Sequence, residues 1–153
     1  MRFPRSSGTL VHPTSFPGKY GIGDFGYEAR AFIDFLEDTH QTIWQVLPLT
    51  PTGYGNSPYA SYSAFAGNPF LISPDILLEK GLLKASEVNA LIIQSTTTVA
   101  YDEAFEKKSS ALALACKRFY EQADADQVEA FTVFKKQHSH WLDDYVLFMT
   151  LAK

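Results

Sequence analysis

Three tyrosines in one Gly- and Pro-rich stretch are the residues whose types and spacing most suggest chemistry. Tyr54, Tyr59 and Tyr62 stand between glycines and prolines, with Asn56 and Ser57 beside them. Flat aromatic faces next to hydroxyl and amide groups suit a sugar, which offers apolar C–H faces and a rim of hydroxyls. Gly and Pro fix the backbone of such a loop, because one tolerates positive φ and the other locks it. These residues fit a carbohydrate-binding loop, and they fit equally well an aromatic loop that packs on its own scaffold.

The segments before this loop predict a β–α–β unit. Residues Thr42 to Leu49 are mostly apolar on both faces, which is typical of a strand buried in a parallel sheet. Gly8 to Ser15 is a second strand candidate. Between the two, apolar residues recur at three- and four-residue steps, which predicts a helix over 24–38. Asp24 would cap this helix, and His40, a residue type that tolerates the left-handed conformation, would follow its end.

The predicted unit decides where the tyrosine loop lies. The strands of a β–α–β unit run parallel, and ligands bind beyond the carboxyl ends of such strands. The tyrosine loop leaves the carboxyl end of the second strand, and the segment from His12 to Ser15 leaves that of the first. This placement favours a functional loop over simple packing.

After the loop the sequence turns helical, and no further strand is predicted. The expected helices run from Ser73-Pro74 to Gly81, over Ser86–Leu91, Asp102–Tyr120 and Asp124–Lys136, and then continue or restart over His140–Lys153. In the helix over 102–120, the residues expected to face inward are Phe105, Leu112, Ala115, Cys116 and Phe119, so we interpret Cys116 as a buried, unreactive thiol. The chain would therefore divide into an α/β part, residues 1–73, and a helical part, residues 74–153.

Composition and charge exclude several classes of function. The net charge of −4 has interspersed signs, whereas a nucleic-acid partner would call for a basic stripe. No apolar run is long enough to span a bilayer, and Met1 to Arg5 lead into no signal-peptide segment. A single cysteine forms no internal disulfide, which fits a reducing, cytoplasmic compartment. His138 and His140 point to different faces of a helix, so neither a metal nor a cofactor is expected.

The motifs resemble those of the 4-α-glucanotransferases (amylomaltase, disproportionating enzyme; glycoside hydrolase family 77). The matching segments are Arg5–Gly18, Tyr20–Gly26, Trp44–Leu49, Thr52–Ser61, Phe65–Phe70 and Trp141–Phe148. They occur in collinear order over essentially the whole chain, and the combination is highly specific.

The resemblance implies a fold in the α/β class, the (β/α)8 barrel, of which this chain would be an incomplete amino-terminal part. Thr9–Ser15 and Thr42–Leu49 would be the first two barrel strands, and residues from about Pro74 onward a helical insertion after the second. A barrel core alone takes roughly 250 residues. The expected partner of the chain is the carboxy-terminal remainder of its parent barrel.

The resemblance also implies a reaction, the retaining transfer of α-1,4-glucan segments between maltooligosaccharides. That mechanism needs a nucleophilic and an acid/base carboxyl group about 5 Å apart. In the family these groups follow later barrel strands, and no matching segment is present here. We therefore assign no catalytic residue and expect the chain alone to be inactive.

What the resemblance assigns to this chain is part of the glucan cleft. Tyr59 and Ser57 would line the donor side, and Tyr54 would be an outer platform for the glucan with Tyr101 as its partner. A simple aromatic contact between loop and insertion explains Tyr54 and Tyr101 as well. Tyr62 has no role in the family to carry over and is expected to anchor the loop.

Two departures and two alternatives accompany the resemblance. His40 stands where the family commonly has glycine, and Ala100 where an acidic residue is common, and neither lies in the site-forming motif. The chain could instead be a noncatalytic α-glucan-binding module, or a helical interaction domain in which the sugar motif is a relic. Glucan binding would separate the last hypothesis from the other two.

Overall fold

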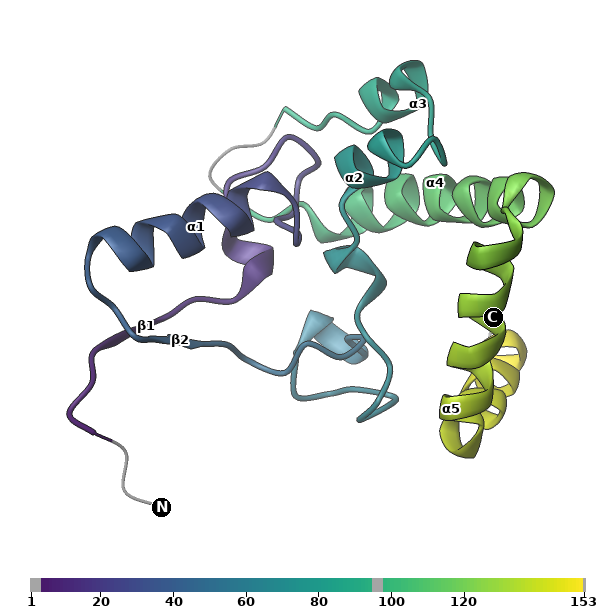
Figure 1. The fold of residues 1–153 in the computed structure, drawn as a ribbon. Coiled ribbons are helices and arrows are strands. Elements are labelled where there is room, and N and C mark those ends of the chain that lie inside the picture. Colours follow the sequence, from purple (N-terminus) through teal and green to yellow (C-terminus); the bar gives the residue numbers. More distant parts are fainter. Residues whose placement is uncertain (1–3, 95–97, 153) are drawn as a thin grey trace.

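A computed structural model describes residues 4–94 and 98–152, and it contains one small parallel sheet followed by helices (Figure 1). Strand β1 (Gly8–Leu10) pairs in parallel with β2 (Ile43–Gln45), with Thr9 opposite Trp44. Helix α1 (Tyr27–Asp38) connects the two strands. The predicted β–α–β unit is therefore confirmed.

Trp44 joins the sheet to α1. Its ring centroid lies 5.3 Å from that of Phe32 on the helix and 5.7 Å from that of Phe16. Its indole N–H donates to the carbonyl oxygen of Val11 at 2.9 Å, beyond the end of β1. One large side chain thus holds the helix on the sheet and also satisfies a backbone group where the strand ends.

Both strands are shorter than predicted. After β1 the chain turns into a short 3-10 helix, η1 (Pro13–Ser15), so the strand expected to reach Ser15 ends at Leu10. Proline has no N–H to donate to a ladder and its φ is fixed, which favours the turn at this point. Likewise β2 ends at Gln45 and not at Leu49. Its residues pair only with the three residues of β1, and the last of these pairs is Leu10 with Gln45.

The start of α1 also differs from the prediction. Its N-cap is Gly26, which provides no side-chain cap, whereas we predicted Asp24 in that role. Asp24 accepts a hydrogen bond from the Gly26 N–H at 2.9 Å and is buried. The predicted end is confirmed, because His40 has φ +56° directly after the C-cap Thr39.

The remaining elements are helical. They are the 3-10 helices η2 (Tyr54–Asn56) and η3 (Pro69–Leu71) and the helices α2 (Pro74–Glu79), α3 (Ala85–Ala90), α4 (Tyr101–Gln122) and α5 (Ala125–Leu151). Ser73 is the N-cap of α2 and Gly81 has φ +72° beyond its end, as predicted. Of the two possibilities left open for the last helices, the structure has the continuous one, α5. In the part of the chain that the structure describes, no helix combines the length and apolar character that crossing a membrane requires.

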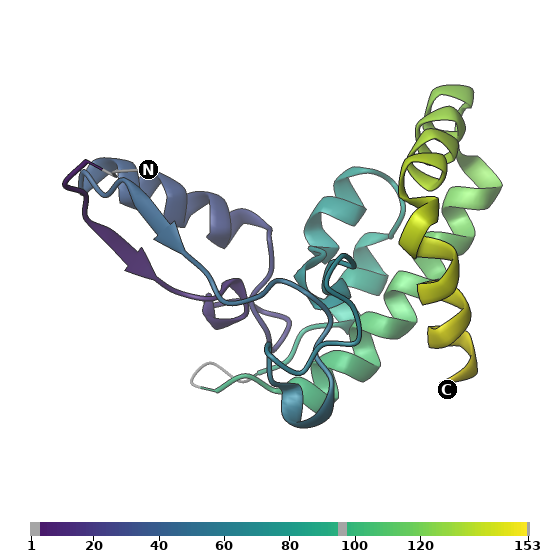
Figure 2. The same ribbon diagram turned by 90° about the horizontal axis from the view of Figure 1, so that it is seen from below.

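The helices form two small cores, and both include residues from the first part of the chain. One contains Tyr20 with five residues of the helical part, namely Leu83, Val88, Leu91, Ala111 and Ala115. The other contains Ile22 and Phe70 with Ile93 and Ala104. The segment before α1 therefore packs into α2–α4, and Figure 2 shows these helices grouped on one side with the sheet and α1 extending away. The division of the chain at residue 73 stays a prediction.

Helix α4 is rotated in part relative to the prediction, since Ala115 is buried as expected. Phe105 is 58% exposed and Cys116 is exposed, although both were expected to face inward. The buried residues are Ala104, Lys108, Ala111 and Ala115. Alanines allow the helix to lie close to its neighbours, where leucine and phenylalanine would need more room. The interpretation of Cys116 as a buried thiol is therefore wrong.

Candidate functional site

A cavity of about 130 Å³ lies where the ends of both strands, the tyrosine loop and the start of α4 meet. Its lining residues are His12, Thr14, Ser15, Leu47, Thr52, Asn56, Pro58, Asn68 and Tyr101. Both the η1 segment and the loop after β2 contribute to this wall, as the parallel strands predicted. The lining is rich in hydroxyl and amide groups, which can exchange hydrogen bonds with a polyhydroxylated ligand.

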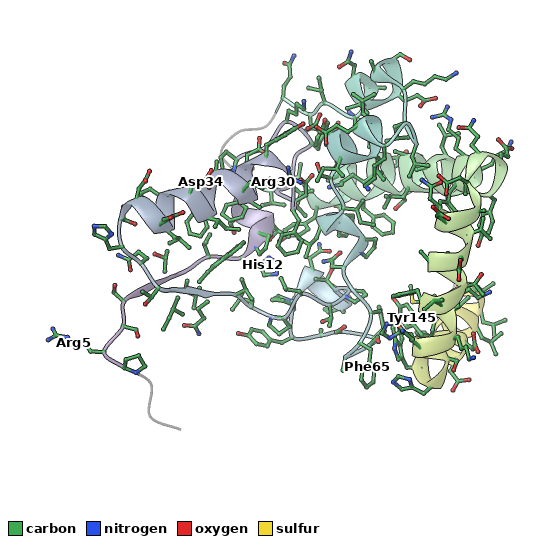
Figure 3. All side chains as sticks on the ribbon, viewed as in Figure 1. Arg5, His12, Arg30, Asp34, Phe65 and Tyr145 are labelled. Atoms are coloured by element: carbon green, nitrogen blue, oxygen red, sulfur yellow. The ribbon has the colours of Figure 1, made fainter. Side chains whose placement is uncertain are left out.

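His12 connects the two strand ends beside the cavity (Figure 3). Its Nδ1 accepts from the Thr14 N–H at 3.3 Å and lies 2.7 Å from the Thr14 hydroxyl. Its Nε2 lies 3.3 Å from the carbonyl oxygen of Pro48, so this nitrogen carries the proton and donates it. Burial lowers the pKa of the imidazole, which favours this neutral form. These contacts hold the segment after β1 and the segment after β2 together.

The tyrosine loop is closed at its base. Thr52 and Ser61 form an antiparallel bridge, and the Gly53 N–H donates to the carbonyl oxygen of Ala60 at 2.5 Å. A β-carbon at Gly53 would approach that oxygen to 2.4 Å, so only glycine fits there. The loop therefore presents the residues between 53 and 60 as a closed unit.

Two left-handed residues shape the tip of the loop. Gly55 has φ +69° and Asn56 has φ +55°, a pair that favours glycine and asparagine. Ser57 follows, and its hydroxyl accepts from the Tyr59 N–H at 3.3 Å. The local turn chemistry thus sets where the flanking rings stand.

The rings of Tyr54 and Tyr59 point into solvent. Tyr54 is 95% exposed and Tyr59 is 74% exposed. An aromatic loop that packs on its own scaffold would cover these rings, since burial of the ring is what stabilises such packing. This observation favours the binding interpretation of the loop over the packing one.

Tyr101 is the one predicted site residue that lines the cavity. As the first residue of α4 it packs partly against the cluster around Ile22 and Phe70. It lines the same cavity as the loop residues Asn56 and Pro58, which flank Ser57, while Ser57 itself is not in the lining. The structure therefore brings Tyr101 near the Ser57 segment and leaves Tyr54 and Tyr59 outside the cavity lining.

The far end of the loop is anchored on α5. The Tyr62 ring centroid lies 5.8 Å from that of Phe148, and the Phe65 ring stacks on Trp141 at 5.9 Å. Figure 3 shows Phe65 directed toward α5 near Tyr145. The prediction that Tyr62 anchors the loop agrees with this contact, although its ring is 57% exposed. The sequence contained a signal for this partner, because Trp141, Tyr145 and Phe148 repeat at steps of four and three residues.

The cavity lining contains no Asp or Glu. Several carboxylates of the described residues are instead engaged in ion pairs: Asp24 with Lys108, Asp75 with Lys19, Glu87 with Arg118 and Glu103 with Lys107. Within residues 4–94 and 98–152, no group of three or more His, Cys, Asp or Glu residues is placed to hold a metal ion. This wall can hydrogen-bond and stack, and its lining provides no carboxylate for a retaining mechanism.

Comparisons with known proteins define the family. A family profile described as 4-alpha-glucanotransferase matches residues 11–153. This chain belongs to the 4-α-glucanotransferase family. It is 46% identical over 151 residues to the 4-alpha-glucanotransferase of Thermus thermophilus, which covers 99% of this chain and 29% of the relative. It is 47% identical over 149 residues to that of Synechocystis sp., which covers 97% of this chain and 30% of the relative.

The structure of the chain matches that of a family member. An amylomaltase from Streptococcus agalactiae in complex with acarbose superposes with a TM-score of 0.89 at 41% sequence identity. The match covers 97% of this chain and 30% of the amylomaltase chain. The chain therefore spans about 30% of the length of the 4-α-glucanotransferases to which it is similar.

Proposed function

We propose that this chain provides the first two strands and the first helix of a (β/α)8 barrel in a 4-α-glucanotransferase, and with them part of the α-glucan cleft. The observation that carries the proposal is the exposed tyrosine loop beside a cavity lined by hydroxyl- and amide-bearing residues at the strand ends, in a chain of this family. The amylomaltase similar to it is in complex with acarbose. The ligands we propose are maltooligosaccharides and longer α-1,4-glucans.

Each predicted site residue has a role in this proposal. Tyr59 and Ser57 line the donor side, and the exposed rings of Tyr59 and Tyr54 are free to stack on sugar faces. Tyr101 lines the cavity together with Asn56 and Pro58, the residues on either side of Ser57. Helix α5 holds the loop from outside through Tyr62.

The catalytic carboxylates belong, in this proposal, to the remainder of the barrel. A retaining transfer needs a nucleophile and an acid/base group on opposite sides of the scissile bond. The chain covers about 30% of its relatives, and the cavity wall it forms holds no carboxylate. We propose a cytoplasmic location, because the single cysteine fits a reducing compartment.

Two measurements on the 153-residue chain test the proposal. Isothermal titration with maltoheptaose should show binding that Tyr59→Ala weakens and that Tyr120→Ala, an exposed ring on α4, leaves unchanged. Incubation with maltotriose should yield neither glucose nor longer maltodextrins above a heat-treated control. Glucan transfer by the chain alone would place catalytic groups within it, contrary to the proposal. Absence of maltoheptaose binding would instead favour a helical interaction domain.

A further inference from the structure

Between Tyr101 and Ala115, the inward face of helix α4 contains a long, charged side chain, Lys108. This face follows three- and four-residue steps from the cavity toward the other end of the helix, through Tyr101, Ala104, Lys108, Ala111 and Ala115. Ala104 is fully buried and Lys108 is 1% exposed. Because the neighbouring alanine side chains are short, Lys108 reaches from this part of the face to another segment.

The Lys108 ammonium binds two segments at once. Its Nζ donates to the Asp24 carboxylate oxygen Oδ2 at 3.1 Å and to the carbonyl oxygen of Phe70 at 2.6 Å. Burial lowers the pKa of this ammonium, and the Asp24 carboxylate opposes that shift. Hydrogen bonds to a charged donor are short and strong, so they hold the segment before α1, η3 and α4 in one arrangement.

Both partners of this ammonium are linked to the cavity wall. Next to Asp24, the Gly23 N–H donates to the carbonyl oxygen of Thr14 at 3.0 Å. The Phe70 N–H donates to Asn68 Oδ1 at 2.9 Å. Thr14 and Asn68 line the cavity. Asp24 is therefore connected to Thr14 through its neighbour Gly23, and Phe70 is connected to Asn68 directly, in each case by one hydrogen bond.

We propose that Lys108 is a positioning residue for the glucan cleft. Tyr101 lies two turns before Lys108 on the same face of α4, so fixing Lys108 against Asp24 and Phe70 fixes where Tyr101 stands relative to Thr14 and Asn68. The inference rests on the proposed function, because it assigns the consequence of this geometry to glucan binding. Lys108 acts through Tyr101 and the wall and touches no ligand.

Four variants of the whole chain separate positioning from stability. Lys108→Met keeps an unbranched stem and leaves the buried Asp24 carboxylate unpaired. The double variant Asp24→Asn with Lys108→Met leaves no unpaired buried charge, so folding stability should return in part while the two ammonium hydrogen bonds stay absent. Leu83→Ala opens a space in the other core, around Tyr20, and should lower stability without altering the cavity. Lys107→Met is the matched control, since this lysine is half-exposed and binds Glu103 and the carbonyl oxygen of Ile92.

The first readout is the backbone and side-chain NMR spectrum. In the double variant we expect shifted resonances and faster amide exchange at Gly23, Thr14, Asn68 and Tyr101, with the helical spectrum otherwise retained. Lys107→Met should leave these resonances in place. Changes confined to the turn of α4 around residue 108, with Thr14, Asn68 and Tyr101 unaffected, would overturn the proposal.

The second readout is the Kd for maltoheptaose. We expect binding to weaken about tenfold in the double variant, because small displacements of positioned groups have effects of this size or larger. Leu83→Ala should lower Tm as much or more and keep the Kd of the unchanged chain. A folded double variant with unchanged Kd, or a parallel loss of binding in Leu83→Ala, would contradict positioning by Lys108. If the unchanged chain binds no maltoheptaose, the proposed function fails, and the NMR readout still decides whether Lys108 places Tyr101.

Discussion

Tyr59 and Tyr62 lie three residues apart in one loop. Their different exposure predicts that Tyr62→Ala lowers stability more, whereas Tyr59→Ala weakens glucan binding more. Tyr62 is 57% exposed and its ring contacts Phe148, so somewhat less than half of the ring is covered. A tyrosine buries about 200 Å² when fully covered, so the covered part of this ring is about 80 Å². At about 25 cal/mol per Å², Tyr62→Ala should lower the free energy of unfolding by about 2 kcal/mol.

The corresponding loss for Tyr59 is smaller. Tyr59 is 74% exposed, so about 50 Å² is covered and Tyr59→Ala should cost about 1.3 kcal/mol by the same reasoning. For a chain of this size, 1 kcal/mol corresponds to about 2–4 °C in Tm. Tyr62→Ala should therefore lower Tm by about 4–8 °C, and Tyr59→Ala by about 3–5 °C.

Maltoheptaose binding should rank the two variants in the reverse order. Tyr59→Ala removes a ring that is free to stack on a sugar. Truncating an aromatic residue on which binding depends costs more than about 1 kcal/mol of binding free energy, which is about fivefold in Kd. Tyr62→Ala should change Kd less, and Tyr62→Phe, which keeps the contact with Phe148, should preserve both Tm and Kd. Calorimetric melting and isothermal titration of each variant measure the two quantities. If Tyr59→Ala lowers Tm as much as Tyr62→Ala and leaves Kd unchanged, the assignment of the two rings is wrong.

Two further predictions concern acid stability and exposed apolar surface. Two hydrogen bonds from Arg118 hold the pKa of the Glu87 carboxyl at about 2, below its ordinary value of 4.5, so its contribution to stability is present above pH 4.5 and is lost as pH falls toward 2. Glu87→Gln should therefore flatten the decline of Tm between these pH values, and parallel declines in the two proteins would contradict this. The sheet and α1 also expose Leu10, Ile43, Ile33 and Phe35, so the chain should bind a hydrophobic dye and self-associate. Phe35→Lys should reduce both the dye fluorescence and the sedimenting mass, and equal values for variant and unchanged chain would show that this surface is not responsible.

The local signals in the sequence located most elements correctly. The serine–proline pair at 73–74 starts α2, Gly81 follows its end with positive φ, and His40 follows α1 in the left-handed region. These features depend on φ preferences and missing N–H groups of single residues, which the sequence contains directly. The apolar run over 42–49 and the helix before it were sufficient to predict a parallel pair, because the connection between parallel strands has one favoured hand.

The lengths of the strands and the cap of α1 depended on partners that local sequence does not specify. A strand continues only where a neighbouring strand offers backbone N–H and C=O partners, and from Pro13 onward the chain forms η1 and no longer pairs with β2. Asp24 has the residue type of an N-cap, yet its carboxylate binds the Lys108 ammonium, which is 84 residues away in sequence. No periodicity within either segment could indicate that pairing.

The candidate site was also predicted only in part from the sequence. Residue types and family motifs were enough to select Tyr54, Ser57, Tyr59 and Tyr101 as proposed glucan contacts. Only the tertiary structure decided that Tyr101 lines the cavity while Tyr54 and Tyr59 face solvent, because exposure depends on which segments pack around a ring.

The rotation of α4 was likewise decided by packing. Its periodicity predicted an inward face of phenylalanine, leucine and cysteine together with Ala115, and of these residues Ala115 is buried. In the structure the alanine face with Lys108 is inside, since close approach to the segment before α1 and to η3 leaves room only for small side chains and for one ammonium that both segments can bind. The sequence thus determined which segments are helical and which loop can contact a sugar, and the contacts between distant segments decided which face of each helix is buried.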